Sequence, residues 1–380
     1  MTALARTLER VLAGLEAGLH LGAQLFVWHD GQIVADWAVG ESRPGVPFTP
    51  ETLVLWLSST KPVVAALALQ LRDAGQLDLD QPVAEYLGEF AAAGKAGVTL
   101  RHLLTHTSGF RWVELGWPRT TWPQIIARLS AARLERGWVP GEKAGYHPIT
   151  SWYVLGEVIQ RVSGQPLSQW VRERIFEPLG MHDSWIGMPI ERYFAYGVRV
   201  GLLADTASAA GTPHRYSSQQ GATDCVPGAN GHGPMRELAR FYQMLLDAGV
   251  WQGVRLLERS TVEEMTSRQR VGLVDVTFQH RIDWGLGLIV NSNRYDVPTV
   301  PYHYGPHASD ATFGHSGSQS SVAFADPVHR LVVAAFFNGT PGEAQHQARI
   351  HALCATIYEE LGLVPETRAS TSRPDAGPSP

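Results

Sequence analysis

The apolar positions near the N-terminus follow a helical pattern and then an alternating one. Leucine and valine recur at helical spacing between residues 8 and 15, which predicts an amphipathic helix. The segments 23–29 and 32–39 are typical of strands, and the Asp30-Gly31 pair between them is a strong hairpin signal. The first forty residues are therefore predicted to form a helix followed by a β-hairpin.

From residue 58 to about residue 246 the pattern is mostly helical. Gly75 follows the first of these helices at a position where glycine commonly ends a helix. The segment 187–230 has no hydrophobic period and is rich in Gly, Ser, Thr and Ala, so it is predicted to form loops and a short hairpin. The predicted helices cover residues 63–74, 100–104, 122–132, 152–162, 167–176 and 235–247.

The C-terminal part returns to strands. One strand is predicted over 284–290, and a hairpin is predicted from 320–325 and 331–337 across Asp326-Pro327. A closing helix follows over 345–361. Strands far apart in sequence can share one sheet, so we expect an α+β fold. In this fold an antiparallel sheet is flanked by the N- and C-terminal helices, and a helical subdomain is inserted.

The expected organisation is a single catalytic domain over residues 1–365. Its sheet part is predicted at about 1–57 and 270–365, and its helical part at about 58–269. The tail 366–380 is rich in Pro, Ser and Ala, a composition typical of disorder. A cleft between the two parts is the natural place for a site.

Composition narrows the function. The 380 residues are 44% hydrophobic and 18% charged, with a net charge of −5 and no basic run, which argues against nucleic acid as a partner. Cys225 and Cys354 lie far apart and are expected to be free thiols in a reducing compartment. Neither a signal-peptide pattern nor an apolar run of membrane-span length is present, so the sequence predicts a cytoplasmic protein.

The segment Ser58-Ser59-Thr60-Lys61 carries the clearest chemistry. Ser58 and Lys61 are three residues apart, so they share one face of a helix that Pro62 places at its first turn. A serine hydroxyl becomes a nucleophile when a base takes its proton, and burial makes a lysine into such a base by lowering its pKa. Taken alone, the pair is better explained as an N-cap serine beside a solvated lysine.

Two further segments supply what this pair lacks. Tyr146 precedes a predicted helix and is placed to move a proton near Lys61, or else it packs on that helix as a half-buried tyrosine. His315-Ser316-Gly317 leads into the strand 320–325, where a glycine allows the backbone to approach a substrate closely. The amide of Ser318 or Gln319 would then join that of Ser58 in an oxyanion hole.

These three segments resemble the three motifs of the penicillin-recognising serine enzymes. The chain is more specifically similar to the beta-lactamase-related serine hydrolases, a group that includes class C beta-lactamases, family VIII esterases, D-aminopeptidases and acyltransferases. Residues 76–83, 100–110 and 177–181 also match this family's sequence, and the resemblance covers the chain to about Gly362. It implies a beta-lactamase/transpeptidase-like fold.

The resemblance also implies a mechanism. Ser58 attacks a carbonyl, Lys61 takes its proton, Tyr146 assists, and the acyl group rests on Ser58. Two departures from the beta-lactamase pattern matter. Pro148 stands where those enzymes have the asparagine of a Tyr-x-Asn motif, and His315 replaces a lysine that pairs with a substrate carboxylate. Both changes favour neutral esters or thioesters.

Other candidates for the site have two interpretations each. His147 is a substrate-binding candidate that either tunes Tyr146 or points to solvent. Trp112, Trp117 and Trp122 form either an acyl pocket or ordinary core, and Trp112 is taken as a substrate-binding candidate. His303 and His307 lack acidic or cysteine partners at metal spacing, so we expect a loop at the cleft entrance. His102 and His106 are expected to cap and pack a helix. No metal and no cofactor is expected.

The leading hypothesis is a cytosolic serine esterase or transacylase with a small-molecule acyl donor and an optional acyl acceptor. A D-aminopeptidase, an amidase or a weak beta-lactamase is the alternative within the same class. A non-catalytic binding protein is the alternative from another class, although it would not need Ser58, Lys61 and Tyr146 together.

Overall fold

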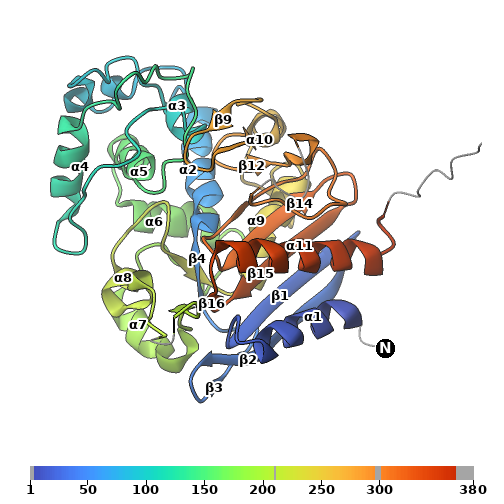
Figure 1. The fold of residues 1–380 in the computed structure, drawn as a ribbon. Coiled ribbons are helices and arrows are strands. Elements are labelled where there is room, and N and C mark those ends of the chain that lie inside the picture. Colours follow the sequence, from blue (N-terminus) through green and yellow to red (C-terminus); the bar gives the residue numbers. More distant parts are fainter. Residues whose placement is uncertain (1–3, 209–210, 296–300, 365–380) are drawn as a thin grey trace, which may run out of the picture.

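The computed structural model describes residues 4–208, 211–295 and 301–364. The predicted disordered tail 366–380 lies outside these residues. A mixed arrangement of helices and one large antiparallel sheet is observed, as predicted (Figure 1). The sheet order is β11 (Asp283–Trp284), β12 (Ile289–Val290), β13 (Phe313–Ser316), β14 (Ser321–Asp326), β15 (Leu331–Phe337), β1 (Gly22–His29), β2 (Gln32–Arg43) and β3 (Val46–Pro47).

Both predicted hairpins are confirmed. β1 pairs with β2 across Asp30 and Gly31, whose φ angles of 43° and 90° are both positive. Such φ angles match the turn type whose twist suits a two-residue hairpin, which explains the Asp-Gly pair. β14 pairs with β15 from Ser321 opposite Phe336 to Asp326 opposite Leu331.

The central strands are buried on both faces, and their side chains divide between two cores with a period of two. In β15, Val332, Ala334 and Phe336 join the larger core, which extends into the helical part. The alternate positions 331, 333, 335 and 337 join the smaller core beneath the terminal helices α1 (Ala5–Glu16) and α11 (Glu343–Glu360). These two helices lie side by side over one sheet face (Figure 1).

The helical part surrounds a buried central helix, α2 (Lys61–Asp73), which packs on α5 (Thr150–Ser163). The other predicted helices form within two residues of their expected ends. α9 falls within the predicted helical part but packs on β14, β15 and β1. The remaining helices are α3 (Leu100–Leu104), α4 (Trp122–Ala131), α6 (Leu167–Val171), α7 (Ile190–Tyr196), α8 (Gln219–Thr223), α9 (Met235–Leu246) and α10 (Arg259–Thr266).

Two local predictions are wrong. The segment 187–230 contains α7 and α8, and its strand β5 (Ala204–Asp205) pairs in parallel with β16 (Gly339–Thr340) rather than in a hairpin. The predicted strand 284–290 is two short strands, β11 and β12, that fold back on each other. The predicted helix 167–176 is confirmed over its range, because α6 is followed directly by a π-helix at Arg172–Phe176. The other short strands are β4 (Val54–Leu57), β6 (Gly231–Gly233), β7 (Val250–Trp251), β8 (Val254–Arg255), β9 (Val274–Asp275) and β10 (His280–Arg281).

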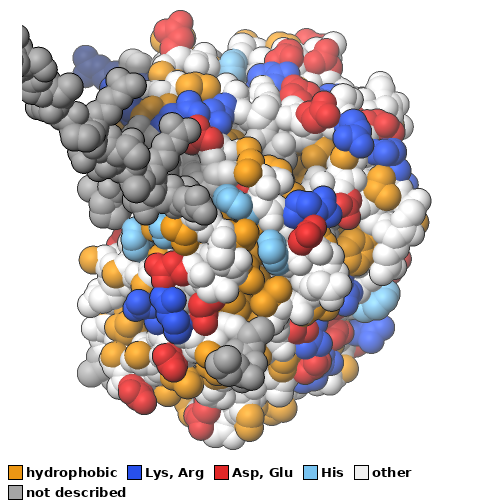
Figure 2. Space-filling model, turned by 90° about the vertical axis from the view of Figure 1, so that its right-hand side faces the viewer, with side chains coloured by type: hydrophobic (Ala, Val, Ile, Leu, Met, Phe, Trp, Pro, Cys, Tyr) orange, Lys and Arg blue, Asp and Glu red, His pale blue; other side chains and the backbone are white. Residues whose placement is uncertain are grey.

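On the face in Figure 2, Lys and Arg side chains are interspersed with Asp and Glu, with no broad basic field. Among the helices of the described residues, none combines the length and the hydropathy that a bilayer crossing needs.

Candidate active site

A sharp turn places Ser58 where a strand meets a helix. β4 ends at Leu57, whose φ of 50° and ψ of −131° are unusual for a residue with a side chain. Such backbone costs on the order of 1–3 kcal/mol and is typical of functional sites. A 3-10 turn, Ser58–Thr60, then leads directly into α2. The strained residue therefore presents the Ser58 hydroxyl at the start of a buried helix.

Lys61 is fully buried beside Ser58. Its Nζ donates to Ser58 Oγ at 3.0 Å and to the carbonyl of Gly228 at 2.6 Å. Burial lowers the pKa of Lys61 well below its ordinary value of 10.5. Among the described residues Lys61 forms no ion pair that would oppose this shift. The lysine is thereby suited to accept the serine proton, as predicted.

Tyr146 completes the central group. Its hydroxyl donates to Ser58 Oγ at 2.7 Å, and its ring lies 5.1 Å from Lys61 Nζ. Burial raises the pKa of Tyr146, and the negative charge of Asp275 raises it further, so the phenol keeps its proton. The structure thus brings together the three residues predicted to be catalytic.

Aromatic rings hold Tyr146 on its other sides. Trp284 of β11 stacks on it with centroids 5.7 Å apart, and Phe278 and His106 lie at 4.9 Å and 4.7 Å. His106 has a positive φ of 57°, and its Nδ1 accepts the backbone N–H of His147. The predicted packing role of His106 is therefore confirmed.

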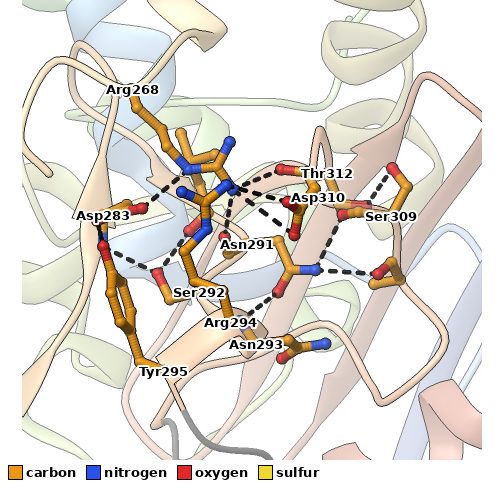
Figure 3. Close-up of polar contacts among 12 residues, drawn as sticks. Arg268, Asp283, Asn291, Ser292, Asn293, Arg294, Tyr295, Ser309, Asp310 and Thr312 are labelled. Atoms are coloured by element: carbon orange, nitrogen blue, oxygen red, sulfur yellow. Dashed lines mark hydrogen bonds and ion pairs between the residues drawn. The ribbon is translucent and has the colours of Figure 1, made fainter. Parts of the chain in front are cut away.

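A polar network anchors the strand that carries Trp284 (Figure 3). The carboxylate of Asp283 is buried and accepts from Arg268 Nε and from the Tyr295 hydroxyl, each at 2.8 Å. Its backbone N–H donates to Ser292 Oγ at 2.8 Å. These contacts fix β11 and with it the ring that stacks on Tyr146. No role for Asp283 was predicted from the sequence.

Two residues of the third predicted segment, His315 and Ser316, lie on strand β13 itself, and Gly317 follows the end of this strand. The His315 ring is 6.1 Å from that of Tyr146 and 5.6 Å from that of Trp284. Its Nδ1 donates to the carbonyl of Ser316 at 2.8 Å, which leaves Nε2 as a buried acceptor without a partner in the described residues. Burial lowers the pKa of His315 to about 3, so the ring is neutral at pH 7.

Position 317 requires a glycine, because its backbone packs closely against β4, the strand that ends just before Ser58. A Cβ at this position would lie 2.4 Å from the Trp56 carbonyl oxygen and 3.0 Å from Leu57 Cβ. Ser321 Oγ ties these elements together, since it donates to the Trp56 carbonyl at 2.7 Å and accepts from the Gly317 N–H. The sequence did not single out Ser321, because its partners are distant in the chain.

Ser318 and Gln319, the two residues after Gly317, differ in exposure and in hydrogen bonding. Ser318 is exposed, whereas the Gln319 side chain turns away to accept from the Gly342 N–H at 2.7 Å. Within the described residues neither backbone amide of this pair donates a hydrogen bond. Both amides are available for the predicted oxyanion hole, but the Gln319 side chain is committed elsewhere.

The structure contradicts the placement of His147 at the substrate or in solvent. Its side chain is fully buried, and Nε2 accepts from the backbone N–H groups of Gly109 and Phe110 at 3.0 Å and 3.2 Å. Ser108 Oγ lies 3.1 Å from the same atom. His147 therefore organises the 108–110 loop. The sequence-based prediction for His147 rested on its position next to Tyr146. It missed this role because side chains adjacent in sequence point in different directions.

His147 should make the fold sensitive to acid. Burial lowers its folded-state pKa from 6.5 to about 3, so between these values the unfolded chain binds a proton that the folded chain does not. Stability is thus lost as the pH falls below 6.5. Replacing His147 by glutamine should flatten the pH dependence of the unfolding free energy by up to about 1.4 kcal/mol per pH unit.

Urea denaturation between pH 7.5 and 5.5 measures this slope. The exposed His182, replaced by glutamine, is the matched control and should leave the slope unchanged. A His147→Gln variant with the wild-type slope would contradict the assignment.

Pro148, two residues beyond Tyr146, lines a cavity of about 220 Å³. Trp112, which is 65% exposed, and Trp117 line it, whereas Trp122 lies elsewhere and bonds to Glu157. Of the three tryptophans, Trp112 and Trp117 therefore line this cavity, and Trp122 lines a neighbouring one together with Trp117. The other lining residues include Ile149, Thr150, Tyr153, Arg215 and Tyr216.

His102 and His303 are framework residues. His102 forms a capping box with Thr99, as predicted. His303 is buried against His351 with ring centroids 5.0 Å apart, rather than lining the cleft entrance. Within the described ranges, no group of three His, Cys, Asp or Glu side chains is arranged to hold a metal.

The comparison with known families decides the classification. A model of the family described as beta-lactamase matches residues 8–355. The chain belongs to the beta-lactamase family. The predicted resemblance and the beta-lactamase/transpeptidase-like fold are thereby confirmed.

Relatives within the beta-lactamase family point to ester chemistry. "Esterase/beta-lactamase LipL" of Mycobacterium tuberculosis is 28% identical over 349 residues, 83% of this chain and 77% of LipL. A solved penicillin-binding protein homologue from Caulobacter crescentus is 30% identical with a TM-score of 0.78, covering 95% of this chain and 98% of the homologue. A solved family VIII carboxylesterase is 28% identical with a TM-score of 0.77, covering 93% and 97%. This beta-lactamase-family protein is a serine hydrolase of the esterase-like kind.

Proposed function

We propose that the protein is a serine esterase or transacylase that forms an acyl-enzyme at Ser58 with a neutral small-molecule ester or thioester. The observation that carries this proposal is the position of Ser58 Oγ, 3.0 Å from Lys61 Nζ and 2.7 Å from the Tyr146 hydroxyl. A buried lysine with a lowered pKa is an effective base for a serine proton.

The proton path follows from the two pKa directions. Ser58 Oγ attacks the carbonyl carbon as its proton passes to Lys61 Nζ. The phenol of Tyr146 is still protonated at this point and gives its proton to the departing oxygen or sulfur. It then regains a proton from Lys61. Water or an alcohol then attacks the acyl-enzyme, and the same residues return the proton to Ser58. The amides of Ser58 and Ser318 stabilise the oxyanion.

The neutral character of the substrate rests on two positions. His315 is buried with a pKa of about 3 and offers no positive charge for a carboxylate next to the scissile bond. Pro148 has no side-chain amide to bind the amide of a beta-lactam, and it lines the cavity. Relatives described as an esterase and as a family VIII carboxylesterase support the same choice.

An aminopeptidase is less well supported. A free ammonium group needs an unopposed carboxylate, and Glu114 is the acid that lines the cavity. Arg111 and Arg215 line the same cavity, and Glu114 Oε1 already accepts from the Gly116 N–H at 2.8 Å. A cytoplasmic location and the absence of a nucleic-acid partner stay predictions from the sequence.

A substrate panel tests the proposal. We expect turnover of p-nitrophenyl esters and acyl thioesters. If the protein is a transacylase, addition of a primary alcohol should shift the product from the free acid to the ester of that alcohol. Nitrocefin should be turned over slowly or not at all. Rapid nitrocefin turnover without ester turnover would overturn the esterase proposal.

Trp112 should determine the preference for larger acyl groups. Its indole is 65% exposed at the cavity, so its removal costs little folding energy but removes contact area for the acyl chain. Trp112→Ala is expected to lower kcat/KM for aromatic or long-chain esters by about tenfold relative to the acetate ester. Phe194, also 65% exposed but on α7, is the matched control, and Phe194→Ala should leave this ratio unchanged. An unchanged ratio for Trp112→Ala would rule out the cavity as the acyl pocket.

A further inference from the structure

The β9–β10 hairpin makes an unexpected set of contacts with the tyrosine segment. Asp275 of β9 is fully buried, although it lies 129 residues from Tyr146. Its Oδ1 accepts the backbone N–H of Tyr146 at 3.0 Å. The same oxygen accepts the N–H groups of Thr277 and Phe278 at 2.9 Å and 3.3 Å, which closes the hairpin turn. One carboxylate oxygen thus joins the turn to the catalytic tyrosine.

The other contacts of the hairpin surround the same tyrosine. Thr277 Oγ1 donates to the carbonyl of Tyr146 at 3.1 Å, and the Phe278 ring packs on the Tyr146 ring. The backbone of Val276 donates to the carbonyl of Ala144 at 3.0 Å. The N–H, the carbonyl and one ring face of Tyr146 are therefore all held by residues 275–278.

Arg270 supplies the opposite charge. Its side chain is almost fully buried, and Nη2 donates to Asp275 Oδ2 at 3.0 Å and to the Ile282 carbonyl at 3.0 Å. Nη1 donates to the carbonyl of Thr105 at 3.1 Å. The guanidinium lies 5.2 Å from the Trp284 ring, which stacks on Tyr146. The ion pair is thus in contact with the tyrosine through both the backbone and a ring.

We propose that the β9–β10 hairpin is a clamp that sets the position and the ionisation of Tyr146, with Asp275 as its positioning residue and Arg270 as the counter-ion. A buried ion pair is a costly way to close a surface hairpin, and apolar residues of similar size often serve equally well. The contact of this ion pair with the proton-donating tyrosine gives the pair a function, which is to position Tyr146. The role rests on the proposed function, because it concerns the activation of Ser58.

The charged and titratable groups that face Tyr146 come from several elements. They are Lys61 of α2, His106 after α3, His315 of β13 and Asp275 of β9, with Tyr302 behind Phe278. Burial is the largest cause that raises the pKa of Tyr146, and the Asp275 charge adds to it. Replacing Asp275 by asparagine removes that charge and leaves Arg270 unpaired. Both effects favour loss of a proton from Tyr146.

The test measures Ser58 reactivity without relying on an ester substrate. A fluorophosphonate probe labels an activated serine by displacing fluoride, and intact mass spectrometry follows the rate against pH. Asp275→Asn is expected to slow labelling about 10- to 100-fold, as for a misplaced catalytic group, and to move the falling limb of the pH profile, where Tyr146 loses its proton, to lower pH. Labelling at the wild-type rate with an unchanged profile would overturn the clamp, as would a slower rate with an unchanged profile.

Thr277 provides a second variant that leaves the buried pair intact. Thr277→Val should slow labelling about threefold to tenfold through loss of one hydrogen bond, whereas Thr277→Ser should retain the wild-type rate. Equal rates for these two variants would also count against the clamp. If the wild type is labelled at Ser58 but turns over no ester or thioester, the proposed function fails while the clamp is still tested.

Discussion

Replacing Ser58 by alanine is expected to lower kcat for p-nitrophenyl esters by about 10⁴-fold or more, the scale seen when a serine nucleophile is removed. Ser58 Oγ is the shared acceptor of hydrogen bonds from Lys61 and Tyr146, and no neighbouring hydroxyl takes its place. Ser59 points away, toward the His315 carbonyl and Ser321 Oγ. Steady-state kinetics with several acyl groups measures the loss.

The matched control is Ser163→Ala at the far end of α5. It changes the same side chain outside the site and should keep wild-type kcat. Equal loss in both variants would indicate damage to the fold. Full ester turnover by Ser58→Ala would refute the mechanism.

Replacing Lys61 by methionine is the second large change, and its effects on activity and on stability should differ. Methionine preserves the length of the side chain but cannot accept a proton, so kcat should fall about 10³-fold, within the range of general-base removal. Burial of the ammonium group disfavours its charged form in the folded state. The free energy of unfolding should therefore stay equal or rise.

Lys95 offers a close comparison, because it is the other fully buried lysine of the described residues. Its Nζ donates to the carbonyls of Ala92 and Ser130 at 2.8 Å and 3.0 Å, and also to that of Ala132. Lys95→Met should lower stability and keep kcat. If Lys61→Met retained kcat, or Lys95→Met lost it, the role of Lys61 as base would be wrong.

The local fold was predictable where short-range chemistry determines it. Asp30-Gly31 predicted the first hairpin because its turn needs two positive φ angles. The segment 284–290 was misjudged, since Gly285 and Gly287 break an apolar run that otherwise looks like one strand. At Gly285 a Cβ would lie 2.2 Å from the Met265 carbonyl oxygen, a contact that the sequence cannot reveal.

The catalytic group was predictable as well, because its motifs are short and ordered along the chain. Ser58, Lys61 and Tyr146 meet as expected. The supporting residues were not predictable, since Gly228 acts through its carbonyl and Asp275 through a contact across 129 positions. His147 was misplaced for the reverse reason, because proximity in sequence suggested a role that its burial excludes.

Trapping the acyl-enzyme tests whether Ser58 carries the acyl group during turnover. Wild-type protein is mixed with excess p-nitrophenyl butyrate, quenched in acid within the steady state, and analysed as intact protein and as proteolytic peptides by mass spectrometry. We expect one butyryl group per chain, on the peptide that contains Ser58, and none on Ser58→Ala. A butyryl group on any other residue during productive turnover would contradict it, as would full turnover by Ser58→Ala.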